Sequence, residues 1–298
     1  MTQTVWLNGV YLARSEARIS PFDRGFLLGD SVYEVTAVYG GRLIDMERHL
    51  DRLQRSLTEL RFPVLPDRQE LEAMHRRLIA DNAVKEGLVY LQVSRGAYGE
   101  RNFLPPTDDK VRLTCFAFAE SKALVDTPAS RGGIRAITLP DIRWGRRDIK
   151  TTQLLASVLA KGEAKARDAQ DAWLVAPDGL VNEGASSNAW IVNRDGDVLT
   201  RPLSNDILPG VTRHGLMDLL SAQGRKVVER AFSVDEAYGA TEAFQTGAGA
   251  LVWPVVAIDG RTIGSGQPGS VTRAIQKLYY QAAGVDVARA APWVLGAA

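Results

Sequence analysis

Short alternating runs of hydrophobic and polar residues are interrupted along the chain by dipeptides that favour tight turns between strands. These are Asn8-Gly9, Gly40-Gly41, Asp178-Gly179, Asp195-Gly196 and Asp259-Gly260. Gly, Asn and Asp adopt the positive φ angles that two-residue hairpin turns need, and β-branched or aromatic residues flank most of these dipeptides. The pattern predicts antiparallel strand pairs from one end of the sequence to the other.

Helical periods lie between these hairpins. The clearest is formed by Met46, Leu50, Leu53, Leu57 and Leu60, which recur every three or four residues with Arg and Glu on the opposite face, and this predicts an amphipathic helix. Further helices are expected near residues 67–82, 151–168, 211–222 and 270–283. Strands and helices alternate without a regular βαβ rhythm, which indicates a mixed α/β (α+β) fold with antiparallel-rich sheets and packed helices.

Two details of these helices follow from the same pattern. Ser270 follows Gly269 and is expected to cap the last helix. In the segment 151–168, the stripe Leu154, Leu155, Val158 and Leu159 is expected to face inward.

A change of composition divides the chain. Residues 121–133 follow neither the helical nor the strand period and end in small residues. We therefore expect a smaller N-terminal α/β domain over 1–120, a linker over 121–133 and a larger C-terminal domain over 134–285. The Ala-rich residues 286–298 are expected to form a loosely attached tail.

Composition excludes several classes of protein. The 298 residues include 45% hydrophobic and 24% charged residues, which is typical of a globular protein. With 36 Lys and Arg against 35 Asp and Glu, the chain lacks the basic excess of a nucleic-acid binder. The single cysteine, Cys115, is expected to be buried in a strand, and a lone cysteine favours a reducing compartment. No run approaches the roughly 18 apolar residues of a membrane span. We expect a cytoplasmic protein without a membrane partner.

Candidate chemistry is concentrated in a few segments. The three histidines, His49, His75 and His214, lack the spacing of metal ligands, so no metal site is expected. The segment Gly247-Ala248-Gly249 either forms a plain tight turn or directs backbone N–H groups at an anion. The Pro209-Gly210 loop runs straight into a helix that begins at Val211, and its first N–H groups favour a phosphate or simply start an ordinary helix.

A lysine and a glutamate are candidates for chemistry on a cofactor. Lys150 lies between an apolar strand and a helix, where it is either a solvated lysine or an amine that points into a cleft. Arg143, Arg146 and Arg147 precede it and, if they share its space, favour the neutral amine by charge repulsion. Glu183 is either a surface carboxylate or a group that holds a heterocyclic nitrogen protonated.

Several separated segments, in this order, resemble the fold-type IV pyridoxal 5′-phosphate (PLP) enzymes, and within them the D-amino acid aminotransferases. The similarity extends from about Trp6 to Gly284. It rests on segments 23–35, 49–53, 141–150, 182–188 and 208–213. The resemblance implies a two-domain fold with PLP in the cleft between the domains.

The resemblance also implies roles for individual residues. Lys150 would form the Schiff base with PLP and move the proton, and Glu183 would bind the pyridine nitrogen. Arg52 would pair with the phosphate. Leu208 would pack on the ring, and Ser186 and Ser187 would belong to the surrounding hydrogen-bonding shell. The remaining phosphate contacts would come from Gly210, Val211, Thr212, Gly247, Ala248 and Gly249.

For the substrate, the resemblance implies that Tyr33 helps to hold the α-carboxylate and that Arg101 is the arginine that traps it. Three features depart from the family pattern. One extra residue precedes Arg101, and Phe103 stands where the typical D-amino acid enzyme has a histidine. Ala248 and Gly249 also stand where related enzymes often have threonines.

The expected reaction is a ping-pong transamination between a D-amino acid and a 2-oxo acid through pyridoxamine phosphate, with small molecules as substrates and a homodimer as the functional unit. An (R)-selective amine aminotransferase, an enzyme of mixed specificity and a branched-chain L-amino acid aminotransferase are the alternatives. An aminodeoxychorismate lyase and a cofactor-binding protein without turnover are further alternatives.

Overall fold

The computed structural model describes residues 3–106 and 111–296, and the chain divides into two compact units. Unit 1 comprises Met1–Lys122 and Ile149–Gln153, and unit 2 comprises Ala123–Asp148 and Leu154–Ala298. The break after Lys122 lies in the segment expected to be a linker. Residues 149–153, which the sequence pattern assigns to the second domain, belong to unit 1 because Tyr33 N donates to Lys150 O and Thr152 N donates to Ser31 O.

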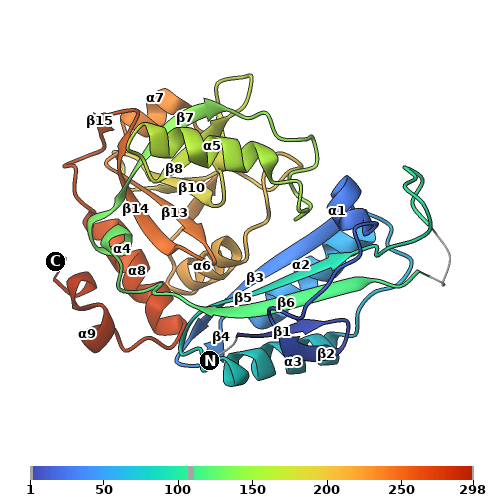
Figure 1. Cartoon of the computed structure of the whole chain (residues 1–298). Coiled ribbons are helices and arrows are strands. Elements are labelled where there is room, and N and C mark those ends of the chain that lie inside the picture. Colours follow the sequence, from blue (N-terminus) through green and yellow to red (C-terminus); the bar gives the residue numbers. More distant parts are fainter. Residues whose placement is uncertain (1–2, 107–110, 297–298) are drawn as a thin grey trace. The chain divides into compact units, whose positions relative to one another are not determined.

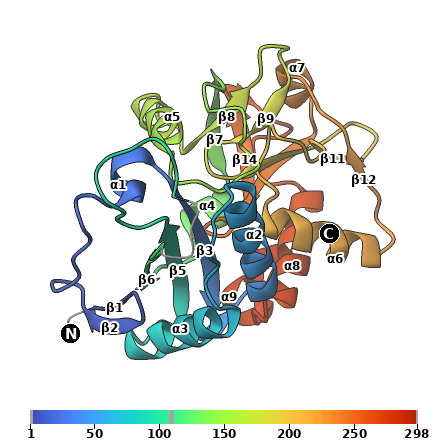
Figure 2. The same ribbon diagram turned by 90° about the vertical axis from the view of Figure 1, so that its right-hand side faces the viewer.

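Unit 1 is an antiparallel sheet, and the two longer of its helices cover one face (Figures 1 and 2). In the described residues the sheet order is β2-β1-β6-β5-β3-β4. Its strands are β1 (Thr4–Leu7), β2 (Val10–Ala13), β3 (Ser31–Tyr39), β4 (Arg42–Leu43), β5 (Glu86–Ser94) and β6 (Thr114–Ser121). Its helices are α1 (Arg24–Leu28), α2 (Met46–Glu59) and α3 (Arg68–Asp81).

The side-chain alternation of β3 gives the two faces of this sheet different roles. Glu34 pairs with Leu91 in the strand register and lies on the face covered by α2 and α3. Tyr33 pairs with Gln92 and lies on the other face, where its ring stacks on Tyr90. Neighbouring residues of one strand thus serve the core and the open face.

Unit 2 contains a larger mixed sheet. In the described residues its order is β12-β11-β10-β13-β14-β7-β8-β9, and β15 pairs with β14. The strands are β7 (Ile134–Pro140), β8 (Asp171–Val175), β9 (Val181–Gly184), β10 (Asn188–Val192), β11 (Val198–Thr200), β12 (Val227–Glu229), β13 (Glu242–Gly247), β14 (Leu251–Ile258) and β15 (Arg261–Thr262). Strand β9 contacts β10, which lies further along the same sheet, so the sheet curves back on itself. Four large aromatic residues are fully buried in this unit: Trp173, Trp190, Phe232 and Phe244.

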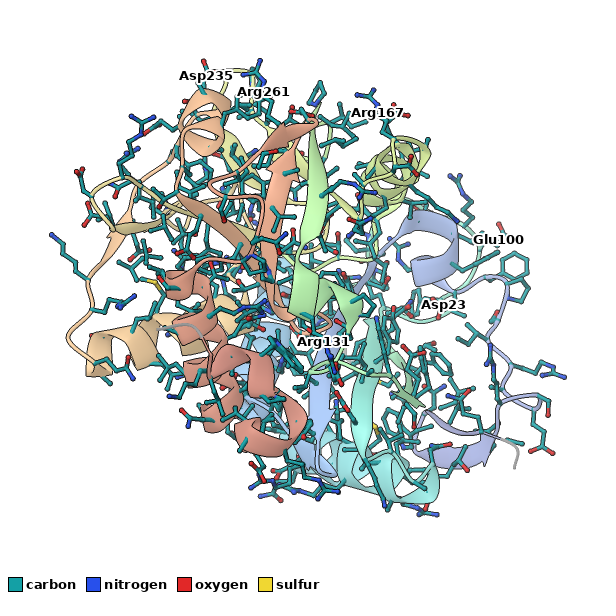
Figure 3. All side chains as sticks on the ribbon, turned by 90° about the vertical axis from the view of Figure 1, so that its left-hand side faces the viewer. Asp23, Glu100, Arg131, Arg167, Asp235 and Arg261 are labelled. Carbon is teal, nitrogen blue, oxygen red and sulfur yellow. The ribbon has the colours of Figure 1, made fainter. Side chains whose placement is uncertain are left out.

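The helices of unit 2 are α4 (Pro128–Gly132), α5 (Leu155–Ala166), α6 (Val211–Ala222), α7 (Val234–Tyr238), α8 (Ser270–Ala282) and α9 (Val287–Ala290), with a 3₁₀ turn over Pro292–Val294. Helix α5 packs on β7 and β8, and α6 and α8 pack on β13 (Figure 1). Charged side chains such as Arg167, Asp235 and Arg261 lie at the surface of this unit (Figure 3). In the described residues, no helix is both long enough and apolar enough to cross a membrane.

The structure confirms the mixed fold class, all five hairpin turns and the five predicted helices. Each of the five dipeptides joins two antiparallel strands, and Asn8, Gly9, Asp259 and Gly260 have the positive φ angles that such turns need. Cys115 is buried in β6, and burial raises the pKa of its thiol to about 12.

The expected inward stripe of α5 was wrong. Leu155, Val158 and Leu159 are 71%, 61% and 57% exposed, and the buried face of the helix consists of Ala160 and Ala164. The short alanines allow the helix to lie close to β8. Packing against a neighbouring sheet therefore decided which face is buried.

The expected cap of α8 was also wrong. Gly269 is the N-cap and Ser270 makes no cap bond. Instead, the carboxylate of Glu242 on β13 accepts hydrogen bonds from Val271 N at 2.9 Å and Thr272 N at 2.7 Å. The carboxylate of a distant strand therefore accepts the hydrogen bonds at the start of the helix that the serine hydroxyl was expected to accept.

Two segments without an obvious period are ordered. Helix α4 lies inside the expected linker and begins with a capping box of Thr127 and Ser130. The expected loose tail forms α9 and a 3₁₀ turn, with Val287, Ala291 and Val294 buried. Buried apolar contacts hold these residues in place.

Candidate active site

Unit 1 brings together Lys150, Tyr33 and the helix that carries Arg52. Lys150 N donates to Ser56 Oγ at 3.4 Å, and Ser56 lies on α2 one turn after Arg52. Lys150 Nζ lies 4.0 Å from the centroid of the Tyr33 ring, within range of a cation–π interaction. The lysine is thus fixed to β3 and α2 through its backbone, while its amine stands over an aromatic ring on the open face of the sheet.

Arg52 is the centre of a buried charge cluster that the sequence pattern did not predict. Its Nε and Nη2 donate to Glu34 Oε1 and Oε2, each at 2.8 Å. His49 Nδ1 lies 2.7 Å from Glu34 Oε2. Burial by itself raises the pKa of Glu34, but Arg52 and His49 outweigh it and hold the pKa well below its usual range. The one signal in the sequence is a carboxylate at an inward position of an apolar strand.

Unit 2 brings together most of the residues expected to bind a cofactor. Glu183 on β9 is 3% exposed, and Leu208 N lies 3.1 Å from each of its carboxylate oxygens. Asn188 donates to Glu183 Oε2 at 2.8 Å and to Leu208 O at 3.0 Å. Glu183 is therefore a buried carboxylate, and the alternative of a surface carboxylate is wrong.

The loop that begins at Leu208 leads directly into α6. Its N-cap is Gly210, and no side chain caps the helix. A Cβ atom on Gly210 would lie 1.9 Å from Asn188 Oδ1, so only glycine allows this close approach. The helix begins at Val211 and Thr212, where backbone N–H groups and the positive end of the helix dipole favour an anion.

A tight turn lies beside the same segment. Ala250 N donates to Gly247 O at 3.0 Å, which closes a turn over residues 247–250 that includes Ala248 and Gly249. A Cβ on Gly247 would lie 3.2 Å from Ser186 O. Ser186 is exposed, whereas Ser187 is buried and donates to Asp171 Oδ2 at 3.3 Å. The segments 183–188, 208–212 and 247–249 therefore meet in one region of unit 2.

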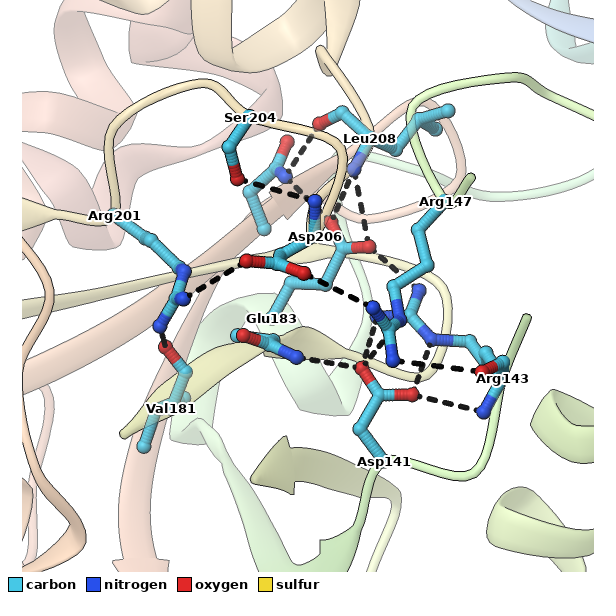
Figure 4. Close-up of polar contacts among 11 residues, drawn as sticks. Asp141, Arg143, Arg147, Val181, Glu183, Arg201, Ser204, Asp206 and Leu208 are labelled. Atoms are coloured by element: carbon cyan, nitrogen blue, oxygen red, sulfur yellow. Dashed lines mark hydrogen bonds and ion pairs between the residues drawn. The ribbon is translucent and has the colours of Figure 1, made fainter. Parts of the chain in front are cut away.

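The electrostatics of Glu183 depend on an arginine (Figure 4). Arg143 Nη1 donates to Glu183 Oε1 at 2.6 Å. Burial raises the pKa of Glu183, and the charge of Arg143 opposes this effect. Arg143 and Arg147 also pair with Asp141, and Arg146 pairs with Asp148. The three arginines expected to repel the amine of Lys150 thus each have a carboxylate partner, which compensates their charge.

The residues expected to bind substrate lie in unit 1. Arg101 and Phe103 are exposed, and the Arg101 guanidinium lies 4.9 Å from the centroid of the Phe103 ring. The loop backbone is held by the buried Arg24, which donates to Phe103 O at 3.4 Å and to Leu104 O at 3.5 Å. In the described residues, no hydrogen bond, ion pair or ring contact joins Arg101 to Tyr33 within one chain.

Comparison with known proteins places these features in a family. The family model described as Amino-transferase class IV matches residues 31–258. The chain belongs to the class IV aminotransferases. It is 36% identical to the D-alanine aminotransferase of Bacillus licheniformis over 272 residues, which cover 91% of this chain and 94% of that protein. It is 35% identical to the D-alanine aminotransferase of Staphylococcus aureus over 277 residues, which cover 92% of this chain and 96% of that protein.

Solved structures agree on the family. The Escherichia coli branched-chain amino acid aminotransferase aligns with a TM-score of 0.86 at 26% identity and covers 94% of both chains. The T.th. branched-chain amino acid aminotransferase with pyridoxamine 5′-phosphate aligns with a TM-score of 0.83 at 26% identity and covers 95% of both chains. This class IV aminotransferase therefore has the fold-type IV architecture expected from the sequence.

Aminotransferases of this class depend on PLP, and the residues present fit that cofactor. Glu183 is a buried carboxylate suited to a protonated ring nitrogen, and the N-terminus of α6, which no side chain caps, is suited to a phosphate. Glycine at position 210 lets the backbone before α6 approach Asn188, since a Cβ there would clash with Asn188 Oδ1. Lys150 supplies the primary amine that such chemistry requires.

Proposed function

We propose that this class IV aminotransferase transfers the amino group of a D-amino acid to a 2-oxo acid in a ping-pong reaction. The observation that carries the proposal is the short path from Leu208, whose N–H donates to the buried Glu183, to the uncapped start of α6 at Val211. A carboxylate that can bind a ring nitrogen and a helix start that can bind an anion are thus only a few residues apart along this loop. The preference for D-amino acids rests on relatives that are named D-alanine aminotransferases and share 35–36% of their residues with this chain.

These positions support the cofactor-binding roles that the resemblance implies. When bound, PLP supplies an aldehyde that accepts the amino group and a ring that withdraws electrons from Cα. Glu183 would hold the proton on the ring nitrogen, and Leu208 would pack on the ring. The phosphate would be bound by Arg52, by the N–H groups of Val211 and Thr212, by the Thr212 hydroxyl and by the 247–249 turn. Ser186 and Ser187 would belong to the surrounding hydrogen-bonding shell.

Lys150 moves the proton. Its amine would hold the cofactor and, when free of it, would accept and return the proton of the substrate Cα. The Tyr33 ring, whose centroid lies 4.0 Å from Nζ, would help to orient the amine. Tyr33 and Arg101 hold the α-carboxylate, because a guanidinium offers two parallel hydrogen bonds to a carboxylate.

A panel of amino donors tests the substrate class. The purified holoenzyme is mixed separately with D-alanine, L-leucine and (R)-1-phenylethylamine, without an acceptor, and the loss of the PLP absorbance is followed. D-alanine should react fastest. A reaction with L-leucine or with the amine alone would instead assign the protein to the branched-chain or the (R)-amine aminotransferases.

The role of Lys150 is tested by chemical trapping. Borohydride reduction of the holoenzyme should leave the cofactor covalently attached to Lys150, as located by mass spectrometry of peptides. Lys150→Ala should abolish attachment and turnover, whereas Lys165→Ala, which changes an exposed lysine of α5, should retain both. Attachment to another lysine would overturn the assignment.

Arg101→Ala should raise the KM for D-alanine and leave the reaction with the simple amine unchanged, because only the amino acid carries a carboxylate. Equal loss with both donors would show that the carboxylate is held elsewhere. Phe103→His restores the residue expected in the typical D-amino acid enzyme and should lower the KM for D-alanine. An unchanged KM would remove Phe103 from the substrate site.

A homodimer is part of the proposal. The outward side chains Leu155, Val158 and Leu159 of α5 form a strongly exposed apolar face, which favours contact with a second copy of the chain. Light scattering should give twice the chain mass of 32.5 kDa, and Leu155→Glu combined with Leu159→Glu should weaken the dimer. A dimer unaffected by this change would assign the interface to another surface. The cytoplasmic location stays a prediction.

A further inference from the structure

Asp141 follows the last residue of β7, its side chain is fully buried, and several groups around Glu183 converge on it. Its backbone N–H donates to Val175 O at 2.8 Å. Its oxygens accept from Arg143 Nε at 3.0 Å, Arg143 Nη2 at 2.8 Å and Asn182 Nδ2 at 2.7 Å. Arg147 Nε lies 3.1 Å from Asp141 Oδ2. Asp141 therefore fixes the residue before Glu183 and the arginine on Glu183 at the same time (Figure 4).

The strand register explains why these groups meet. In the order β7-β8-β9, Leu139 pairs with Leu174, and Leu174 pairs with Glu183. The row that contains Glu183 therefore lies close to the end of β7, where the chain continues into Asp141 and Arg143. Arg143 and Glu183 are 40 positions apart, so the sequence alone does not reveal this contact.

The Arg143 guanidinium contacts two carboxylates, those of Asp141 and Glu183, through different N–H groups. Its Nε and Nη2 bind Asp141 in a bidentate pair, and Nη1 is directed at Glu183 (Figure 4). This arrangement fixes the plane of the guanidinium, so the N–H that contacts Glu183 has a defined direction. Asn188 Nδ2 and Leu208 N also donate to the Glu183 carboxylate, and both of these donors are neutral.

The charge of Arg143 matters because Glu183 is desolvated. Burial favours the neutral carboxylic acid and raises the pKa of Glu183, and among its described neighbours Arg143 is the cation that opposes it. Burial also opposes the ionised form of Asp141, but the hydrogen bonds and charge of Arg143 outweigh it and lower the pKa of Asp141 to about 2. Asp141 thus stays ionised and keeps Arg143 in place.

We propose that Arg143 and Asp141 are positioning residues of the transamination site, in which Arg143 keeps Glu183 ionised and Asp141 orients Arg143. This inference rests on the proposed function, because Glu183 matters to catalysis through the ring nitrogen. A carboxylate holds a proton on that nitrogen, whereas a neutral carboxylic acid does not, and the ring then withdraws electrons from Cα less strongly. Neither residue touches the reacting atoms.

A second branch of the same network reaches the loop before α6. Arg147 Nη1 donates to Asp206 Oδ1 at 3.1 Å, and Arg201 Nη2 donates to Asp206 Oδ2 at 3.2 Å. Asp206 lies two residues before Leu208, whose N–H contacts Glu183. Asp141 therefore supports Glu183 from two sides, through Arg143 and through the Arg147–Asp206 pair.

The test compares Arg143→Gln, Arg143→Lys and Asp141→Asn with wild type and with Arg230→Gln. Arg230 is half exposed and pairs with Glu236 at the surface of the same unit, so it is a matched control. For Arg143→Gln we expect kcat with D-alanine to fall about tenfold or more, since each pKa unit of the ring nitrogen corresponds to a tenfold change in its proton equilibrium. The KM should change little, because the substrate carboxylate is bound elsewhere.

Two readouts separate this role from a merely structural one. The kinetic isotope effect with α-deuterated D-alanine should increase in Arg143→Gln, because proton removal from Cα becomes slower. The absorbance spectrum of the bound cofactor should shift as the ring nitrogen loses its proton. Arg143→Lys should recover part of kcat because it restores the charge, and Asp141→Asn should lie between wild type and Arg143→Gln.

The outcomes are distinguishable. Wild-type kcat and spectrum in a folded Arg143→Gln variant, with circular dichroism and melting temperature unchanged, would overturn the inference. Equal losses in Arg143→Gln and Arg143→Lys would also overturn it, because charge would then be irrelevant. If wild type itself binds no PLP and converts no donor, the proposed function fails instead.

Discussion

Replacing Glu34 by Gln tests how the structure holds Arg52. The side chain of Glu34 is 2% exposed and that of Arg52 is 9% exposed. The change removes a negative charge that accepts two hydrogen bonds from Arg52 and contacts His49, yet keeps the shape of the side chain. Removing one partner of a buried ion pair costs about 3–5 kcal/mol, because the remaining charge stays desolvated. We expect a loss of this size in the free energy of unfolding.

The assay is equilibrium unfolding in denaturant at pH 7, followed by circular dichroism. Glu47→Gln is the matched control, because Glu47 is an exposed acid on the same helix as Arg52 and pairs with Arg68. Exposed pairs contribute about 0–1 kcal/mol, so the control should be nearly neutral. The double variant Glu34→Gln with Arg52→Met should lose less stability than the sum of the single variants, since the two residues are coupled.

The same variant bears on the cofactor. If Arg52 binds the phosphate, Glu34→Gln should weaken the binding of PLP more than that of pyridoxal, which lacks the phosphate. A loss of stability no larger than that of Glu47→Gln would refute the reasoning about the buried pair. An equal effect on PLP and pyridoxal would remove Arg52 from the phosphate site.

Two further predictions concern a histidine and a glycine. Burial lowers the pKa of His75 to about 4, so as pH falls below the ordinary value of about 6.5 the unfolded chain takes up the proton first. Wild type should therefore lose about 2 kcal/mol more stability than His75→Asn between pH 7 and pH 5, as measured by denaturant unfolding, and equal losses would contradict this. Gly210→Ala should lower the melting temperature and the PLP affinity, because its Cβ would lie 1.9 Å from Asn188 Oδ1 and overpacking costs about 1–3 kcal/mol. Gly162→Ala, where a Cβ meets nothing within 4 Å, should leave PLP affinity unchanged, and an identical response of both variants would contradict the steric argument.

Much of the fold could be predicted because its signals are local. The hairpin dipeptides adopt their φ angles through their own backbone preferences, and α2 follows from the spacing of its leucines. Two missed helices also had local signals. Helix α4 begins with the capping box of Thr127 and Ser130, and α7 begins with that of Ser233 and Glu236.

For the candidate site, the sequence indicated some residues but not their partners. The family resemblance selected Lys150, Glu183 and Thr212 as candidate site residues, because their neighbours in sequence carry distinctive patterns. It did not identify Glu34, Asp141 or Arg143 as partners of these groups. A charged residue on a buried strand or in a loop gives no indication of which distant residue it faces, because the contact depends on strand order and register.

The sequence by itself determined where strands turn, where the longer helices lie and which segments are candidates for the chemistry. Only the tertiary structure decided that α5 buries alanines and exposes leucines, that Glu242 caps α8, and that Arg143 lies on Glu183. The physical reason is the separation in sequence over which each interaction acts. Backbone preferences and periodicity act over a few residues, whereas burial and charge pairing are settled between segments that meet only when the sheets assemble.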